Sequence, residues 1–151
     1  MNHFFKYVIF INVISFFFFK QCNSFEVDEI DTGIFVHFGK QEENSPINKG
    51  DIANIGFIVG NKSVMVIDTG GTPRIGKMLL DSIRKISQLP ITHIVITHGH
   101  PDHFLGVSAF DKTEAKIVGH ERLNRSIEAN FNFYKQLQIS TTLDPSLKNS
   151  K

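Results

Sequence analysis

The chain has 151 residues, enough for one domain, and its 16 basic and 15 acidic side chains give a formal net charge of +1. Phosphate binding requires a clustered basic surface, so this near balance predicts no nucleic-acid partner. We find no internal repeat, low-complexity stretch or long run of like charge after the first 24 residues.

The first 24 residues have the three-part pattern of a secretory signal peptide. A short basic start precedes an apolar run over residues 7–19, and small side chains follow at Cys22 and Ser24. The run is shorter than the roughly 20 residues that span a bilayer, although an uncleaved anchor is the alternative interpretation. We expect cleavage near Ser24–Phe25, no stable membrane span afterwards, and a mature domain over residues 25–151 in the periplasm or outside the cell.

The predicted elements then alternate between strands and helices. Strands are predicted at residues 34–38, 52–59, 63–67, 91–97 and 115–118, and helices at 72–88 and 120–138. Thr72 fits a helix N-cap, and Pro90 limits the first helix at its other end. The apolar run Val64–Ile67 predicts a strand covered on both faces. The residues after Ile139 carry no pattern, and the order of elements indicates an α/β layered fold.

One short segment concentrates potential metal ligands. His98, His100, Asp102 and His103 directly follow an apolar strand, at the kind of strand end where α/β proteins place their sites. His98 and His100 are two residues apart, so both can point the same way from an extended segment. Asp102 and His103 follow a proline and can face a second position. Imidazole and carboxylate suit zinc, and also iron or manganese, so the spacing predicts one or two metal ions.

This pattern resembles a known signature. His98-x-His100-x-Asp102-His103 is similar to the signature of the metallo-β-lactamase superfamily, and Val66-Ile-Asp68-Thr-Gly70 resembles the earlier aspartate of that family. Finer features, such as Val118-Gly-His120, resemble the periplasmic branch found alongside quinoprotein dehydrogenases. The resemblance implies a four-layer αββα fold. This chain would supply its first half, one mixed sheet with flanking helices.

The resemblance also implies a role for each matching residue. His98 and His100 would bind a first zinc, and Asp102 and His103 a second. Asp102 would also be catalytic, because it would orient the attacking water or take up its proton. Asp68 would hold the loop through hydrogen bonds without touching metal. The implied protein is a zinc-dependent hydrolase, in which a metal-bound hydroxide attacks an ester, amide, lactone, thioester or phosphoester of a small-molecule substrate.

The sequence departs from the family in its later ligands. The family uses a further histidine, a bridging aspartate and a last histidine, whereas the only histidine after His103 is His120, which comes too early to match. We therefore expect a fragment without the second half of the domain. An apolar sheet face would then pair with the missing half or self-associate.

Two other functions remain open. One is a non-catalytic, truncated half-domain that acts as a metal-binding or interaction module. The other is an iron-dependent redox member of the same superfamily. His37 and His93 lie on predicted strands and are interpreted as structural. The substrate cannot be inferred, because the expected pocket walls lie largely in the missing half.

Overall fold

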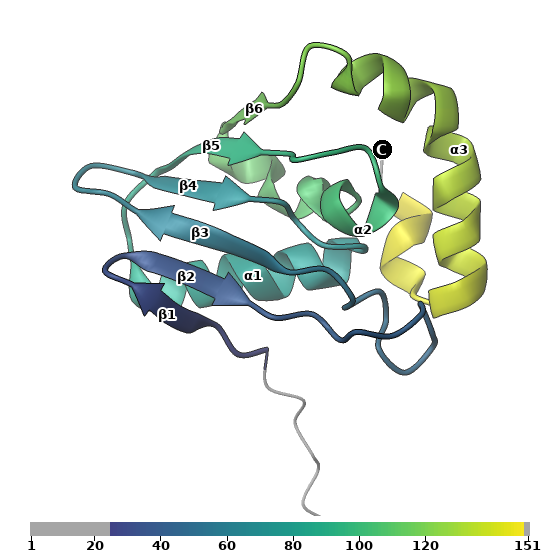
Figure 1. Ribbon diagram of the computed structural model, residues 1–151, viewed down its shortest axis with the longest axis horizontal. Helices are drawn as coiled ribbons and strands as arrows, with labels where there is room; N and C mark the ends of the chain where they lie inside the picture. The colour runs from purple at the N-terminus through teal and green to yellow at the C-terminus, as the bar shows by residue number, and fades with distance from the viewer. Residues whose placement is uncertain (1–24, 150–151) are drawn as a thin grey trace, which may run out of the picture.

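The computed structural model describes residues 25–149, so the predicted signal peptide lies outside the described residues. Six strands form one sheet in the order of the chain (Figure 1). The strands are β1 (Asp28–Asp31), β2 (Ile34–His37), β3 (Ile55–Val59), β4 (Val64–Ile67), β5 (Ile91–Val95) and β6 (Lys116–Val118). Neighbours from β1 to β4 are antiparallel, and β4, β5 and β6 are parallel, which confirms the predicted mixed sheet.

Helix α1 (Pro73–Ile86) connects β4 to β5 and follows the sequence signals closely. The Thr72 hydroxyl accepts a hydrogen bond from the Ile75 amide at 3.2 Å, so the predicted N-cap is confirmed. Ile75, Leu79 and Ile83 recur at helical spacing and are all buried. The helix ends at Ile86 rather than at residue 88, since Ser87 is already extended.

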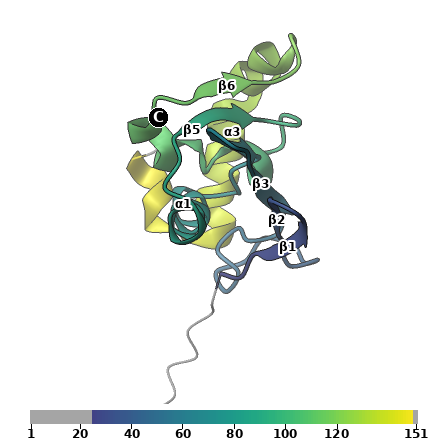
Figure 2. The same ribbon diagram turned by 90° about the vertical axis from the view of Figure 1, so that its left-hand side faces the viewer.

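The core lies between the sheet and α1. Val64 and Val66 of β4 are fully buried on this side, and Phe57 of β3 lies beside Val66 in the register. Met65 and Ile67 point to the opposite face and are only partly buried. Figure 2 shows α1 on one side of β1–β3.

The prediction that β4 is covered on both faces is therefore wrong for the described residues. The sequence could not separate the two cases, because an apolar strand can be packed on one face only and still keep apolar side chains on its more open face. Ile34, Ile58 and Ile67 line a shallow hollow of about 220 Å³ on the less covered face.

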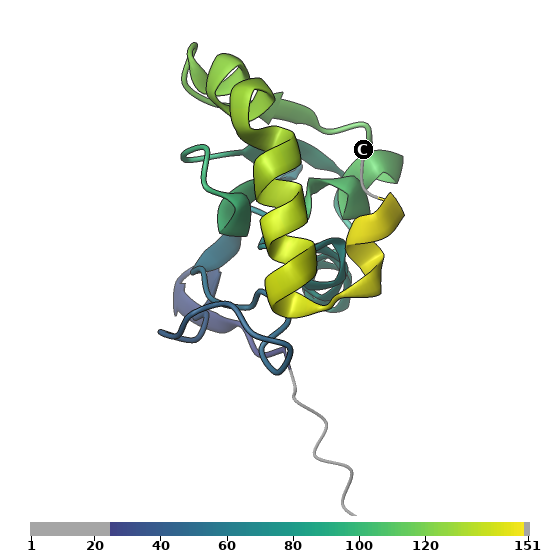
Figure 3. The same ribbon diagram turned by 90° about the vertical axis from the view of Figure 1, so that its right-hand side faces the viewer.

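Helix α3 (Leu123–Thr142) runs across the end of the molecule, in front of the sheet in Figure 3. It begins three residues after the predicted start at His120 and continues past Gln138. A 3₁₀ turn, η2 (Pro145–Asn149), then returns to the core, where Leu147 is fully buried. Residues 140–149, which carry no sequence pattern, thus form the end of α3 and the turn η2. Among residues 25–149, no helix is long and apolar enough to cross a membrane.

Candidate metal centre

Parallel pairing of β4 and β5 brings the two sequence motifs together. Ile67 lies opposite Val95 in the register, and the Asp68 amide continues the pairing with a 2.8 Å hydrogen bond to the Val95 carbonyl. Both strands therefore end at the same edge, where Asp68 meets the loop that starts at Thr97. Figure 1 shows helix α2 (Pro101–Phe104), which carries Asp102 and His103, at this edge.

Asp68 is the buried anchor of the site. Its backbone adopts φ +56°, the left-handed region that Asp enters more readily than most residues, and its side chain is 4% exposed. Oδ1 accepts a hydrogen bond from the Thr97 amide at 2.8 Å. Oδ2 accepts one from the Thr97 hydroxyl at 2.7 Å and one from His103 Nδ1 at 2.7 Å. The carboxylate therefore fixes both ends of the loop that holds the four candidate ligands.

The four candidate ligands lie in two pairs. His98 Nε2 and His100 Nδ1 are 3.2 Å apart, and His103 Nε2 and Asp102 Oδ2 are 3.4 Å apart. The His98 and His103 rings are neighbours, with centroids 4.1 Å apart. His98 and His100 are exposed, whereas Asp102 and His103 are partly buried.

Backbone contacts hold the loop against the segment that follows β4. The Thr69 amide donates to the His103 carbonyl at 2.7 Å, and the Gly106 amide donates to the Gly70 carbonyl at 2.8 Å. The approach is so close that a Cβ added at Gly106 would lie 2.0 Å from the Thr69 oxygen. Only glycine fits at residue 106 without a shift of the backbone.

The charges around the two central histidines move their pKa values in opposite directions. Burial lowers the pKa of His98, and the neighbouring His103 and His100 lower it further. Burial also lowers the pKa of His103, but the hydrogen bond that His103 donates to Asp68 and the charges of Asp102 and Asp68 outweigh it, so the net direction is upward. The loop therefore favours a neutral His98, which is the form that can bind a metal.

The distances within each pair of candidate ligands suit a bound metal ion. Two ligand atoms about 2.0–2.1 Å from a tetrahedral zinc lie roughly 3.3 Å apart, close to both observed separations. No cluster of three or more His, Cys, Asp or Glu residues suited to one ion occurs within residues 25–149. Among the described residues, the candidate ligands therefore approach one another in pairs, His98 with His100 and Asp102 with His103.

Each predicted site residue therefore has a defined place in the structure. Asp68, His98, His100, Asp102 and His103 all come together at the carboxyl ends of β4 and β5. Thr97, which links Asp68 to His98, was not predicted from the sequence as a site residue. Its position in the sequence could have indicated this role, because Thr97 comes directly before the first histidine of the signature. When two parallel strands end at the same edge, a hydroxyl at that position lies between Asp68 and His98.

A family model described as the metallo-beta-lactamase superfamily matches residues 48–138, more than half of the chain. The chain belongs to the metallo-beta-lactamase superfamily. The matched region contains Asp68 and all four candidate ligands. The family expected from the signature is thus confirmed.

Individual relatives of this superfamily member match parts of it. A linear primary-alkylsulfatase from Pseudomonas sp. (strain ATCC 19151) is 40% identical over 67 residues, 44% of this chain and 13% of that protein. Among solved structures, TMB-1, from a study of substrate and inhibitor binding, matches with a TM-score of 0.56 and 22% identity over 70% of this chain and 47% of that one.

The metallo-beta-lactamase FIM-1 from Pseudomonas aeruginosa, in its mono-zinc form, matches with a TM-score of 0.58 and 21% identity over 70% of this chain and 46% of that one. At these identities the two structures establish the fold alone. The chain spans about half the length of both.

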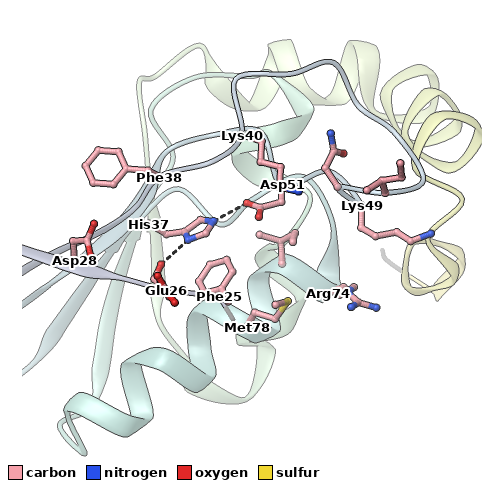
Figure 4. Close-up of a pocket in the computed structure, with 13 residues that line it drawn as sticks. Phe25, Glu26, Asp28, His37, Phe38, Lys40, Lys49, Asp51, Arg74 and Met78 are labelled. Atoms are coloured by element: carbon pink, nitrogen blue, oxygen red, sulfur yellow. Dashed lines mark hydrogen bonds and ion pairs between the residues drawn. The ribbon is translucent and has the colours of Figure 1, made fainter. Parts of the chain in front are cut away.

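A separate hollow of about 330 Å³ lies between the N-terminal segment, α1 and the loop before β3 (Figure 4). Its wall contains His37, which is 7% exposed. His37 Nδ1 lies 2.7 Å from the Glu26 carbonyl and Nε2 lies 2.7 Å from Asp51 Oδ1, while the Phe25 ring stacks on the imidazole at 3.7 Å. These contacts agree with the structural interpretation of His37.

Proposed function

We propose that this protein is a zinc-dependent hydrolase. The observation that carries the proposal is the pair of ligand sets, His98 with His100 and Asp102 with His103, presented at one strand edge in a member of the metallo-beta-lactamase superfamily. Their nitrogen and oxygen donors suit zinc. The mono-zinc neighbour supports zinc in this family. The number of ions, one or two, is part of the proposal, and iron or manganese would suit the same donors.

The residues of the site have distinct proposed roles. Zinc would lower the pKa of a bound water toward about 7 and so supply a nucleophile at neutral pH. The carboxylate of Asp102 would orient the attacking water and accept its proton. Asp68 would keep His103 aligned through the 2.7 Å hydrogen bond to Nδ1, so that Nε2 stays turned toward Asp102.

The proposed substrate is a small molecule with an ester or amide bond. The alkylsulfatase relative, by its name, acts on linear primary alkyl sulfates, so a sulfate ester is the first substrate to test. Carboxylic esters, amides, lactones, thioesters and phosphoesters follow, because the same attack suits each of these centres.

Zinc binding by the full chain tests the proposal directly. We expect the protein to retain zinc after dialysis, and we expect His100→Ala to weaken zinc affinity at least about 10-fold. His93→Ala is the matched control, because His93 is an exposed histidine on β5 whose ring contacts Thr92 and no candidate ligand. Zinc content is measured by elemental analysis and affinity by chelator competition. Equal loss in both variants, or no zinc in the wild type, would contradict the proposal.

Hydrolysis is measured on the same samples with a linear alkyl sulfate and a 4-nitrophenyl ester. We expect turnover that is lost with chelator, restored by zinc and lost in His100→Ala. The second candidate is a metal-binding module without turnover, which is favoured by the pairwise ligands of the described residues. Zinc retention without hydrolysis of any ester class would establish the second candidate instead.

We also propose export to the periplasm or the outside of the cell, on the pattern of the first 24 residues. Cell fractionation with N-terminal sequencing tests this location. A mature N-terminus near Phe25 in the exported fraction supports it, and full-length protein confined to the cytoplasm contradicts it.

A further inference from the structure

The Thr97 hydroxyl lies between the buried carboxylate and the first candidate ligand. Its Oγ1 is 2.7 Å from Asp68 Oδ2 and 3.0 Å from His98 Nδ1. A hydroxyl has one hydrogen, and an ionised carboxylate can only accept. The hydroxyl hydrogen therefore points to Asp68, and the oxygen accepts a hydrogen bond from His98 Nδ1–H.

The same carboxylate oxygen also sets the second histidine. Asp68 Oδ2 accepts a hydrogen bond from His103 Nδ1–H at 2.7 Å. A neutral imidazole carries one N–H, so both rings are left with a lone pair on Nε2. These are the two nitrogens that face the partner ligands, His100 Nδ1 for His98 and Asp102 Oδ2 for His103.

We propose that Thr97 is a positioning residue that fixes the tautomer of His98 through Asp68. One buried oxygen thus prepares a ligand of each pair, His103 directly and His98 through the hydroxyl. The inference rests on the proposed zinc function for its consequence, which is tighter metal binding. The tautomer itself is a property of the metal-free chain.

Packing does not explain the hydroxyl of Thr97. The residue is exposed, so Thr97→Val removes both hydrogen bonds of the hydroxyl, to Asp68 and from His98, with little change in shape or burial. Asp68 keeps its other two donors, the Thr97 amide and His103 Nδ1, in this variant. The fold is therefore expected to survive, and Thr97→Ser restores the hydroxyl.

The chain contains a matched control, Thr92, on the strand β5 that leads to Thr97. Thr92 Oγ1 lies 3.0 Å from Nδ1 of the next residue, His93, the same separation as in the Thr97–His98 pair. Within residues 25–149, no carboxylate is hydrogen-bonded to the Thr92 hydroxyl. Thr92→Val thus makes the same chemical change beside a histidine without breaking a link to Asp68.

The experiment is long-range ¹H–¹⁵N NMR of the histidine rings in the metal-free full chain, at a pH where they are neutral. We expect one tautomer for His98 in the wild type, with the proton on Nδ1, and the same in Thr97→Ser and Thr92→Val. In Thr97→Val we expect a mixture of both tautomers at His98, while His103 is unchanged. Zinc affinity, measured by chelator competition, should fall about 10-fold in Thr97→Val alone.

The outcomes separate the two proposals. An unchanged His98 tautomer in Thr97→Val, or an equal change in Thr92→Val, overturns the role of Thr97 whatever the zinc result. A wild type that binds no zinc overturns the proposed function, while the tautomer still decides the role of Thr97. A general loss of NMR dispersion in Thr97→Val, with Thr97→Ser also altered at His98, would show a structural role and overturn the inference.

Discussion

The Asp68 side chain is almost fully buried, and its carboxylate accepts three hydrogen bonds. In such a place a carboxylate is stabilised by its donors, and the donors are in turn left unpaired if it is changed. The residue thus contributes to stability as well as to the geometry of the candidate site. These two contributions can be measured separately, because the first does not require metal.

We expect Asp68→Asn to destabilise the metal-free protein by about 1–3 kcal/mol, because the amide turns an N–H group toward a donor. The measurement is urea unfolding in the presence of chelator. Asp81→Asn is the control, since the exposed Asp81–Lys77 pair of α1 contributes at most about 0.5 kcal/mol. An equal loss of unfolding free energy in the two variants would contradict the contribution of the Asp68 hydrogen bonds to stability.

His37 predicts a dependence of stability on pH. Burial lowers the pKa of His37, but hydrogen bonds to the Asp51 carboxylate and the Glu26 carbonyl, with the charges of Asp51 and Asp28, outweigh it and raise the pKa above 6.5. The raised pKa means that the folded state binds the proton more tightly than the unfolded state. The contribution is therefore complete below about pH 6.5 and is lost as the pH rises through the folded value.

The test of this dependence compares the wild type with His37→Gln in urea at several pH values. We expect the stability difference between the two proteins to shrink as the pH rises from about 5.5 to 9. A difference that stays constant, or grows, would show that His37 contributes through stacking on Phe25 rather than through charge.

At the scale of elements, α1 and the loop after α2 approach each other closely at Gly76 and Gly106. A Cβ added at Gly76 would lie 2.2 Å from the Gly106 carbonyl oxygen, although alanine is otherwise the better helix former. We expect Gly76→Ala to destabilise the protein by about 1–3 kcal/mol, as overpacking does. The exposed Lys85→Ala in the same helix should change stability little. Thermal unfolding of both variants decides, and a stabilised Gly76→Ala would refute the contact.

The elements that could be predicted from the sequence are those whose apolar residues recur at the spacing of a helix or a strand. Helix α1 combines a capping threonine, a first-turn proline and apolar residues at helical spacing, so its place was predictable. Strand β1 has the polar sequence Asp28-Glu-Ile-Asp31 and forms because β2 offers it an edge. Strand β1 could not be predicted from its own residues, because it is defined by its hydrogen bonds to β2, which exist only in the folded protein.

The end of α3 shows the same limit. Gln138 is fully buried, where its Nε2 donates to the Gly71 carbonyl at 3.1 Å and its Oε1 accepts from Asn44 at 2.8 Å. Contacts between distant parts of the chain thus hold the helix beyond its apolar pattern. The ligand loop was predictable because its spacing is local, whereas the place of Thr97 depends on a partner 29 positions away in sequence.

At the scale of the whole molecule, the sheet has one fully packed face and one that is partly open. Leu79 of α1 is fully buried against the packed face, whereas Met65 of β4 is partly exposed on the other. We expect Leu79→Ala to cost about 2–5 kcal/mol and Met65→Ala distinctly less, because less surface of Met65 leaves water. Urea midpoints measure both variants.

A large cost for Met65→Ala would contradict this difference and show that the open face is covered in solution. Analytical ultracentrifugation of the same samples would then identify self-association as the cause, if the cost falls on dilution. These measurements test the expectation from the sequence that an apolar sheet face pairs with a missing half or self-associates.

Asp68 directly follows the first strand of one strand–helix–strand unit and Thr97 lies just after the second strand, and this placement has a consequence for folding. The hydrogen bonds that orient the ligands close only when β5 docks beside β4 across the helix, and they need no residue of β1, β2 or β3. Ligand orientation should therefore be complete as soon as this unit closes, although its β4–β5 pairing spans more sequence than the pairings among β1, β2, β3 and β4. If cobalt is added during refolding, the absorbance of the bound metal would then report the time at which this strand–helix–strand unit forms.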